Sequence, residues 1–279
     1  MSVLSEAESE QPVLTSAGGV TVETLVRGDG EPIVLLPSLG RGAGDFDEVC
    51  LRLNRAGFQT VCPQPRGFGR SRGPVEDVTM QDLASDVAIA LDGLGIRNAI
   101  VVGHAFGSQP ARMLAQSRPD LVRGLVLAAA SAGKVPARLA ERPYGRLRAE
   151  IDGAGNPALS EEERLRCLQA AFFAPGHDPR QWLGGWNWET HRIQAHAREM
   201  TPVDDYFPAG GVPILDLQAE HDAVVIPHLY REHLGERVRE EVVPGAGHAL
   251  LPERPVQCAE AIIRFAGSVP LPETDASPQ

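Results

Sequence analysis

Gly103-His104-Ala105-Phe106-Gly107 is the stretch that decides the fold, and it reads as Gly-x-Ser-x-Gly with alanine in place of serine. The apolar run 99–102 precedes it, and a helical pattern over 108–117 follows it. Strand, sharp turn and helix form the context in which this motif presents a nucleophile at the end of a sheet. The two glycines let the strand and the helix pack closely against a turn residue in strained backbone geometry. The sequence therefore predicts a turn suited to expose a hydroxyl group, but here it exposes a methyl group.

Outward from this turn, short apolar runs alternate with helical patterns. We predict strands at 20–26, 33–37, 58–63, 99–102, 125–128, 213–217 and 238–243. We predict helices at 46–56, 80–94, 108–117 and 256–265. Such alternation is typical of the α/β class, with a mostly parallel, twisted sheet and helices on both of its faces.

The alternation stops between about Lys134 and Gly211, where helical patterns occur without strands. Ser160-Glu161-Glu162-Glu163 is a capping box that predicts the start of a helix. All three tryptophans lie in this stretch: Trp182, Trp186 and Trp188. The pattern therefore predicts a helical insert, or lid, within a single sheet domain.

Five segments of the chain follow from these patterns. Residues 12–133 and 212–268 are expected to form the sheet core, and residues 134–211 are expected to form the helical cap. Residues 1–11 and 269–279 are rich in Glu, Ser and Pro, and we expect flexible termini there.

Composition limits the kinds of partner. The 279-residue chain is 43% hydrophobic with a net charge of −11, which argues against nucleic acid or an anionic membrane as partner. Four widely spaced cysteines, no signal peptide and no run of 18 apolar residues predict a reduced, cytoplasmic protein. No cluster has metal-ligand spacing and no dinucleotide motif follows the first strand, so we expect neither a metal nor another cofactor. The sequence does not indicate the oligomeric state.

Catalysis by a nucleophile at such a turn requires a histidine base and an acidic residue that orients the histidine. The three occur along the chain in the order nucleophile, acid, histidine. His248 lies in a glycine-rich loop after the last predicted strand, and histidine suits the role of base because an imidazole takes up and releases a proton near working pH. Asp222 follows the preceding strand and is the predicted acid. Glu220 is a weaker candidate, and Asp216 falls inside the strand.

The backbone N–H groups of Leu39 and Phe106 are the predicted oxyanion hole, since main-chain donors at these turns face the reacting carbonyl. Ser38 is a candidate for a hydroxyl contact to substrate. The insert is rich in aromatic residues, and some of them are expected to line an apolar pocket above Ala105. The candidates for substrate contact are Phe173, Trp182 and Trp186.

From Val20 to Phe265 the chain resembles the α/β-hydrolase superfamily, in its lidded esterase, lactonase and C–C hydrolase branch. The resemblance depends on the turn 37–40, the loop 65–71, the motif 103–107, Asp222 and the Gly247-His248 loop. It implies the α/β-hydrolase fold and attack on a small acyl substrate. Ala105 departs from the family pattern, and so does Pro37-Ser38, where many relatives carry His-Gly.

Three explanations of Ala105 remain open. The chain is a Ser-to-Ala variant of a working hydrolase, a natural pseudoenzyme that acts as a ligand receptor, or a catalyst that needs only His248 and the oxyanion hole. The first is favoured, because the acid, the base and both glycines are intact. We therefore expect a serine hydrolase of carboxylic esters with an apolar group, nearly inactive as written but able to bind substrate. Lactones, vinylogous diketones and amides remain open as substrates, because one triad serves all of them.

Overall fold

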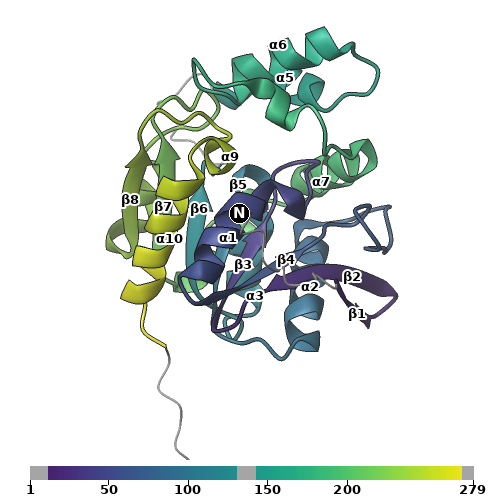
Figure 1. The fold of residues 1–279 in the computed structure, drawn as a ribbon. Helices are drawn as coiled ribbons and strands as arrows, with labels where there is room; N and C mark the ends of the chain where they lie inside the picture. The colour runs from purple at the N-terminus through teal and green to yellow at the C-terminus, as the bar shows by residue number, and fades with distance from the viewer. Residues whose placement is uncertain (1–11, 131–142, 272–279) are drawn as a thin grey trace, which may run out of the picture.

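The computed structural model describes residues 12–130 and 143–271, which form one eight-stranded sheet with helices on both faces (Figure 1). The order across the sheet is β1-β2-β4-β3-β5-β6-β7-β8. Only β1–β2 and β2–β4 pair antiparallel among these strands. Their bounds are β1 Val13–Ala17, β2 Val20–Arg27, β3 Glu31–Leu36, β4 Phe58–Pro63, β5 Ala99–His104, β6 Val122–Ala128, β7 Ile214–Ala219 and β8 Val238–Val243.

The direction in which strands are added reverses between β3 and β5. The chain goes from β3 outward to β4, and then returns to place β5 on the other side of β3. In open parallel sheets, ligands bind beyond the carboxyl ends of the strands at such a switch point. The turn after β3 and the turn after β5 therefore meet where a ligand site is expected.

Two helices cover each face of the sheet. Helices α1 (Asp47–Arg55) and α10 (Pro255–Ser268) lie on one face, and α2 (Met80–Gly93) and α3 (Ser108–Ser117) lie on the other (Figure 1). Because side chains alternate along a strand, Ile100 packs in the core cluster of the first face and Val101 in that of the second. Both faces of β5 are buried, which explains its continuous apolar sequence.

The segment between β6 and β7 is helical where it is described, and Figure 1 shows α5, α6 and α7 grouped at one end of the sheet. Its helices are α4 Pro143–Arg146, α5 Arg148–Ala154, α6 Glu161–Ala171 and α7 Trp188–Met200, with the 3₁₀ turn η3 at Pro179–Trp182. The predicted capping box is present, since the Ser160 hydroxyl accepts from the Glu163 N–H and the Glu163 carboxylate accepts from the Ser160 N–H. The predicted boundary between core and cap at 133/134 lies outside the described residues, so this division stays a prediction.

The predicted α/β-hydrolase fold class is confirmed, and every strand and helix predicted above has a counterpart. Sequence patterns missed the edge strand β1 and two short helices, α8 (Leu229–Leu234) and α9 (Leu250–Glu253). β1 has the burial pattern of an edge strand, with one buried residue among five, and its sequence therefore carries little hydrophobic signal. Both short helices are about one turn long, which is too short for a periodic pattern.

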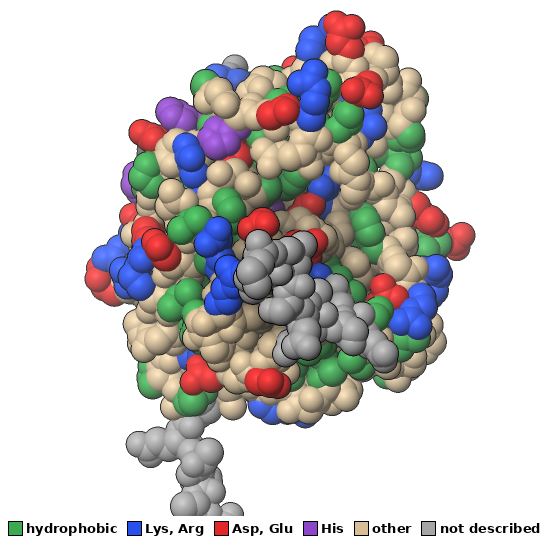
Figure 2. Space-filling model, viewed as in Figure 1, with side chains coloured by type: hydrophobic (Ala, Val, Ile, Leu, Met, Phe, Trp, Pro, Cys, Tyr) green, Lys and Arg blue, Asp and Glu red, His purple; other side chains and the backbone are tan. Residues whose placement is uncertain are grey.

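The surface carries charged side chains of both signs. On the face shown in Figure 2, acidic and basic side chains are interspersed rather than gathered in a patch of one sign. Within residues 12–130 and 143–271, none of the helices has the length and apolarity needed to span a bilayer.

The two glycines of the motif are fixed by close packing. A Cβ at Gly103 would lie 2.5 Å from the Cα of Ser108, and a Cβ at Gly107 would lie 2.2 Å from the carbonyl oxygen of Leu36. Both contacts are with backbone atoms, which cannot move without separating β3, β5 and α3. The turn at residue 105 therefore depends on the absence of side chains on both sides of it.

We predict that Gly107→Ala destabilises the protein by about 3 kcal/mol, because its Cβ has no space against β3. Gly44→Ala is the matched control, since nothing lies within 4 Å of the Cβ position there. The two free energies of unfolding are compared by urea denaturation. Equal effects of the two substitutions would show that the close approach of α3 to β3 is not required.

Candidate active site

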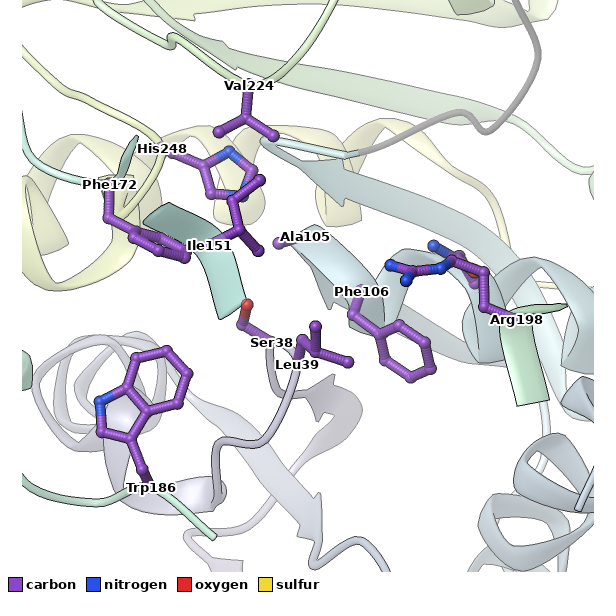
Figure 3. Close-up of a pocket in the computed structure, with 11 residues that line it drawn as sticks. Ser38, Leu39, Ala105, Phe106, Ile151, Phe172, Trp186, Arg198, Val224 and His248 are labelled. Carbon is purple, nitrogen blue, oxygen red and sulfur yellow. The ribbon is translucent and has the colours of Figure 1, made fainter. Parts of the chain in front are cut away.

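Ala105 lies at the junction of β5 and α3 in left-handed backbone, with φ of 47°. A non-glycine residue in this region is strained, typically by 1–2 kcal/mol. The Ser108 hydroxyl donates to the Ala105 carbonyl oxygen at 2.7 Å and so stabilises the turn. The side chain of Ala105 is thereby presented at the carboxyl edge of the sheet, where it lines a pocket (Figure 3).

His248 and Asp222 form a hydrogen-bonded pair beside this position. Their Nδ1 and Oδ2 atoms are 2.9 Å apart, and both side chains are buried. His248 lines the same pocket as Ala105, and Figure 3 shows its ring on the Ala105 side of the pocket. Among the described residues, none makes a hydrogen bond with Nε2 of His248. This is the nitrogen that would take the proton of a hydroxyl at position 105.

The carboxyl group of Asp222 is held in its ionised form. Burial raises the pKa of Asp222. The charge and hydrogen bond of His248 lower it, as do the hydrogen bonds from the N–H groups of Val224 and Val225, and the net result is a lowered pKa. Those N–H groups donate to Oδ1 at 2.8 Å and 3.0 Å. An ionised Asp222 places the imidazole proton on Nδ1, which leaves Nε2 able to act as a base. The weaker candidate Glu220 instead accepts the N–H of Gly245, at 2.7 Å.

The loop that carries His248 is bound to the segment directly after α6. The buried carboxylate of Glu253 accepts the N–H of Gly247 at 2.6 Å and the N–H of Ala174 at 2.8 Å. The Ala249 N–H donates to the carbonyl oxygen of Phe172 at 2.8 Å. His248 is therefore positioned by the sheet core and by the helical segment between β6 and β7 together, and no sequence pattern indicated the part that Glu253 plays.

The predicted oxyanion donors lie on either side of the same pocket. Leu39 and Phe106 both line it, from the turn after β3 and the turn after β5. Among the described residues, the N–H of Leu39 has no hydrogen-bond acceptor. The next N–H, of Gly40, donates to Gln194 Oε1 of α7 at 2.7 Å, so the two successive donors are used differently. A free Leu39 N–H is what an oxyanion hole requires.

The pocket encloses about 420 Å³, including its open mouth. Its wall is largely apolar and comes from both the sheet core and the lid. Of the four predicted substrate contacts, Ser38 and Trp186 line it. The lining residues are Ser38, Leu39, Ala105, Phe106, Gln109, Ile151, Phe172, Trp186, Arg198, Val224 and His248 (Figure 3).

The other two predicted contacts, Phe173 and Trp182, do not line this pocket. Both are buried in the cluster between lid and core, with ring centroids 5.8 Å apart. Trp182 packs against His104 and Phe172 at 5.7 Å and 5.6 Å, so its ring fills space behind the pocket wall. The neighbour Phe172 takes the pocket position expected of Phe173, because successive side chains leave the end of α6 in different directions.

Sequence analysis also missed Arg41, which fastens the lid to the turn that carries Leu39. Its guanidinium lies 4.6 Å and 4.8 Å from the ring centroids of Trp182 and Trp186, and its side chain is 3% exposed. It donates to the carbonyl oxygens of Trp182 and Gly184 and pairs with Asp45. Cation–π contacts of this kind contribute about 2 kcal/mol when they are desolvated.

Four further residues complete the lining of the pocket, and no sequence pattern indicated them as site residues: Ile151, Gln109, Arg198 and Val224. They come from four separate elements or loops, and only the tertiary packing brings them together. Within the described part of the chain, no three His, Cys, Asp or Glu side chains are grouped so as to hold a metal ion. The site can therefore perform acid–base chemistry with His248 and stabilise an oxyanion with main-chain donors.

Comparison with known proteins agrees with this geometry. The sequence model of the Alpha/beta hydrolase family matches residues 33–261. The chain belongs to this family. The match extends from β3 to α10 and so includes Ala105, Asp222 and His248.

Curated relatives in this family have diverse activities. An sn-1-specific diacylglycerol lipase of Danio rerio is 24% identical over 253 residues, which cover 86% of this chain and 79% of the lipase. A non-heme haloperoxidase of Rhodococcus erythropolis is 26% identical over 262 residues, covering 86% and 93% of the two chains. Among solved structures, an esterase from Exiguobacterium antarcticum superposes with a TM-score of 0.74 at 20% identity, covering 92% of this chain and all of the esterase. At that identity the superposition shows the fold alone.

His104, next to Ala105 in sequence, does not line the pocket and instead contacts the backbone of His248. Its Nε2 lies 2.9 Å from the carbonyl oxygen of His248, and its ring is fully buried. Burial, together with the neighbouring charge of His248, lowers its pKa from 6.5 to about 3. His104 is therefore neutral at working pH and donates its Nε2 proton to that carbonyl oxygen.

This burial predicts a pH-dependent stability. As pH falls below 6.5 the unfolded chain takes up a proton at residue 104 while the folded chain does not until about pH 3, so acid favours unfolding. We expect this one group to lower the free energy of unfolding by at most about 1.4 kcal/mol per pH unit in that window. His104→Gln, which keeps a donor, should reduce the slope by about that amount. His228→Gln, at a side chain 61% exposed, is the control, and an equal slope in all three proteins would contradict the assignment.

Proposed function

We propose that the pocket binds a small carboxylic ester with an apolar group, on the scaffold of a serine hydrolase in which Ala105 replaces the nucleophile. The observation that carries this proposal is the arrangement of Ala105, in strained left-handed backbone, beside the His248–Asp222 pair. A side chain with no polar atom gains nothing from that backbone strain. The strain is useful only when the side chain at this position reacts.

With serine at position 105, the pocket would support acyl transfer in two steps. The hydroxyl attacks the ester carbonyl carbon while Nε2 of His248 takes its proton, and the N–H groups of Leu39 and Phe106 stabilise the oxyanion. His248 then gives the proton to the leaving alcohol. Water activated by the same nitrogen cleaves the acyl-enzyme and restores the serine.

With alanine at position 105 the covalent step is absent, and the remaining parts still bind substrate. Loss of the serine in such a triad removes roughly six orders of magnitude of kcat. The pocket, the oxyanion donors and the charged pair remain in place. We therefore propose that this chain binds esters while turning them over very slowly.

A ligand receptor is the second candidate, and Ala105 itself favours it, since a receptor has no use for a nucleophile. A lactonase or a C–C hydrolase would use the same groups on a different carbonyl substrate. A reaction driven by His248 and the oxyanion hole alone is the remaining alternative. These candidates differ in what happens when the hydroxyl is restored.

The test is Ala105→Ser assayed on short p-nitrophenyl esters. We expect kcat to rise by about 10³-fold or more over the alanine form, because the base, the acid and the oxyanion donors are already in position. Burst kinetics at the first turnover would report the acyl-enzyme.

The matched control is the double variant Ala105→Ser with His248→Ala, which has the hydroxyl but no base and should return to the level of the alanine form. Binding of the same esters to the original chain is measured in parallel by tryptophan fluorescence, since Trp186 lines the pocket. A serine form that binds esters without hydrolysing them would favour the receptor. A serine form that neither binds nor hydrolyses them would overturn the proposal.

A further inference from the structure

A second apolar cavity lies directly behind the pocket described above. The space between its walls is about 420 Å³ when the solvent at its mouth is included. It lies between the carboxyl ends of β3 and β4, helix α2 and the start of α3. Its lining residues are Val22, Leu36, Pro37, Pro63, Gln64, Pro65, Leu83, Asp86, Val87, Phe106, Gly107, Pro110 and Gln194.

Among residues 12–130 and 143–271, Phe106 alone lines both this cavity and the active-site pocket. Other residues of the two walls are close neighbours in sequence: Gln109 lines the pocket, and Pro110 lines the cavity. Arg198 and Gln194 are one turn apart on α7, and Arg198 lines the pocket while Gln194 lines the cavity. The two spaces are therefore adjacent, and Phe106 is part of the wall of each.

The carboxylate and amide oxygens of the cavity wall already have partners within the protein. Both oxygens of Asp86 accept from Arg66, at 2.6 Å and 2.8 Å. Gln64 Oε1 accepts the N–H of Ala43 at 3.0 Å, and Gln194 Oε1 accepts the N–H of Gly40 at 2.7 Å. With these acceptors occupied, the cavity suits a hydrocarbon chain rather than a polar group.

The position of His248 shows which part of an ester would face this cavity. His248 lines the pocket but not the cavity. The leaving alcohol must lie within reach of His248, because it takes its proton from that ring. The other substituent of the carbonyl carbon, the acyl chain, therefore points away from His248.

We propose that Phe106 limits the acyl chain of the substrate to a short length, by closing the active site off from the apolar cavity behind it. This inference rests on the proposed function, since it assigns the acyl side of that same site. Phe106 then has two separate roles. Its N–H faces the carbonyl oxygen of the substrate, and its ring ends the space available to the acyl chain.

The experiment uses the chain with Ala105 and measures binding without turnover. Methyl esters of straight-chain acids from acetate to dodecanoate are titrated by calorimetry. Affinity should rise about fourfold for each added methylene until the chain reaches Phe106, and should then level off or fall. In Phe106→Ala the rise should continue over several further methylenes, and Phe106→Leu should give an intermediate limit.

Two controls keep the result specific. Val87→Phe added to Phe106→Ala fills the second cavity from α2 and should restore the short limit. Acetate esters of alcohols of increasing length should show the same limit with and without the Phe106 ring. Melting curves establish that each variant is folded before its affinities are compared.

The outcomes separate this inference from the proposed function. Short esters that bind with an acyl limit unchanged in Phe106→Ala would overturn the role of Phe106 and leave the ester site standing. A limit that extends equally for acyl and alcohol chains would also overturn it, since the cavity would not be on the acyl side. If no ester binds to any form, the proposed function fails and this inference fails with it.

Discussion

The structure depends on one backbone constraint, the left-handed conformation of residue 105 between β5 and α3. That conformation is possible only because Gly103 and Gly107 let α3 approach β3 and β5 to backbone contact. It places the Cβ of residue 105 at the carboxyl edge of the sheet, where the switch point between β3 and β5 also brings the N–H of Leu39. The reacting position, the oxyanion donors and the pocket are thus consequences of a single tight turn.

The helical segment between β6 and β7, the predicted lid, contributes structural contacts to this site. Its contacts reach both loops that flank the pocket. Helix α7 receives the N–H of Gly40 on Gln194, and Glu253 holds the His248 loop and Ala174 of the lid together. Arg41, between two tryptophan rings, adds a third attachment at the turn of Leu39. The geometry of the base and of the oxyanion donors is therefore coupled to the packing of the lid.

The parts of the site that were predictable from sequence are those fixed by local backbone requirements. The motif around Ala105 needs two glycines at fixed offsets, and Asp222 and His248 each follow a readable strand. The lining of the pocket was less predictable, because it depends on which side of a short lid element faces inward. Trp186 lines the pocket while Trp182, four residues earlier in the chain, is buried behind it. Composition places both tryptophans in the lid, but only their packing against Arg41 and His104 separates their roles.

The most direct measurement of the central claim is a crystal structure of this chain with a bound short-chain methyl ester. The account predicts the ester carbonyl carbon above the Ala105 methyl group. It places the carbonyl oxygen within hydrogen-bond distance of the Leu39 and Phe106 N–H groups, and the alcohol oxygen on the side of His248. An ester bound with its carbonyl away from these donors would contradict the account, and so would a residue 105 in ordinary right-handed or extended backbone.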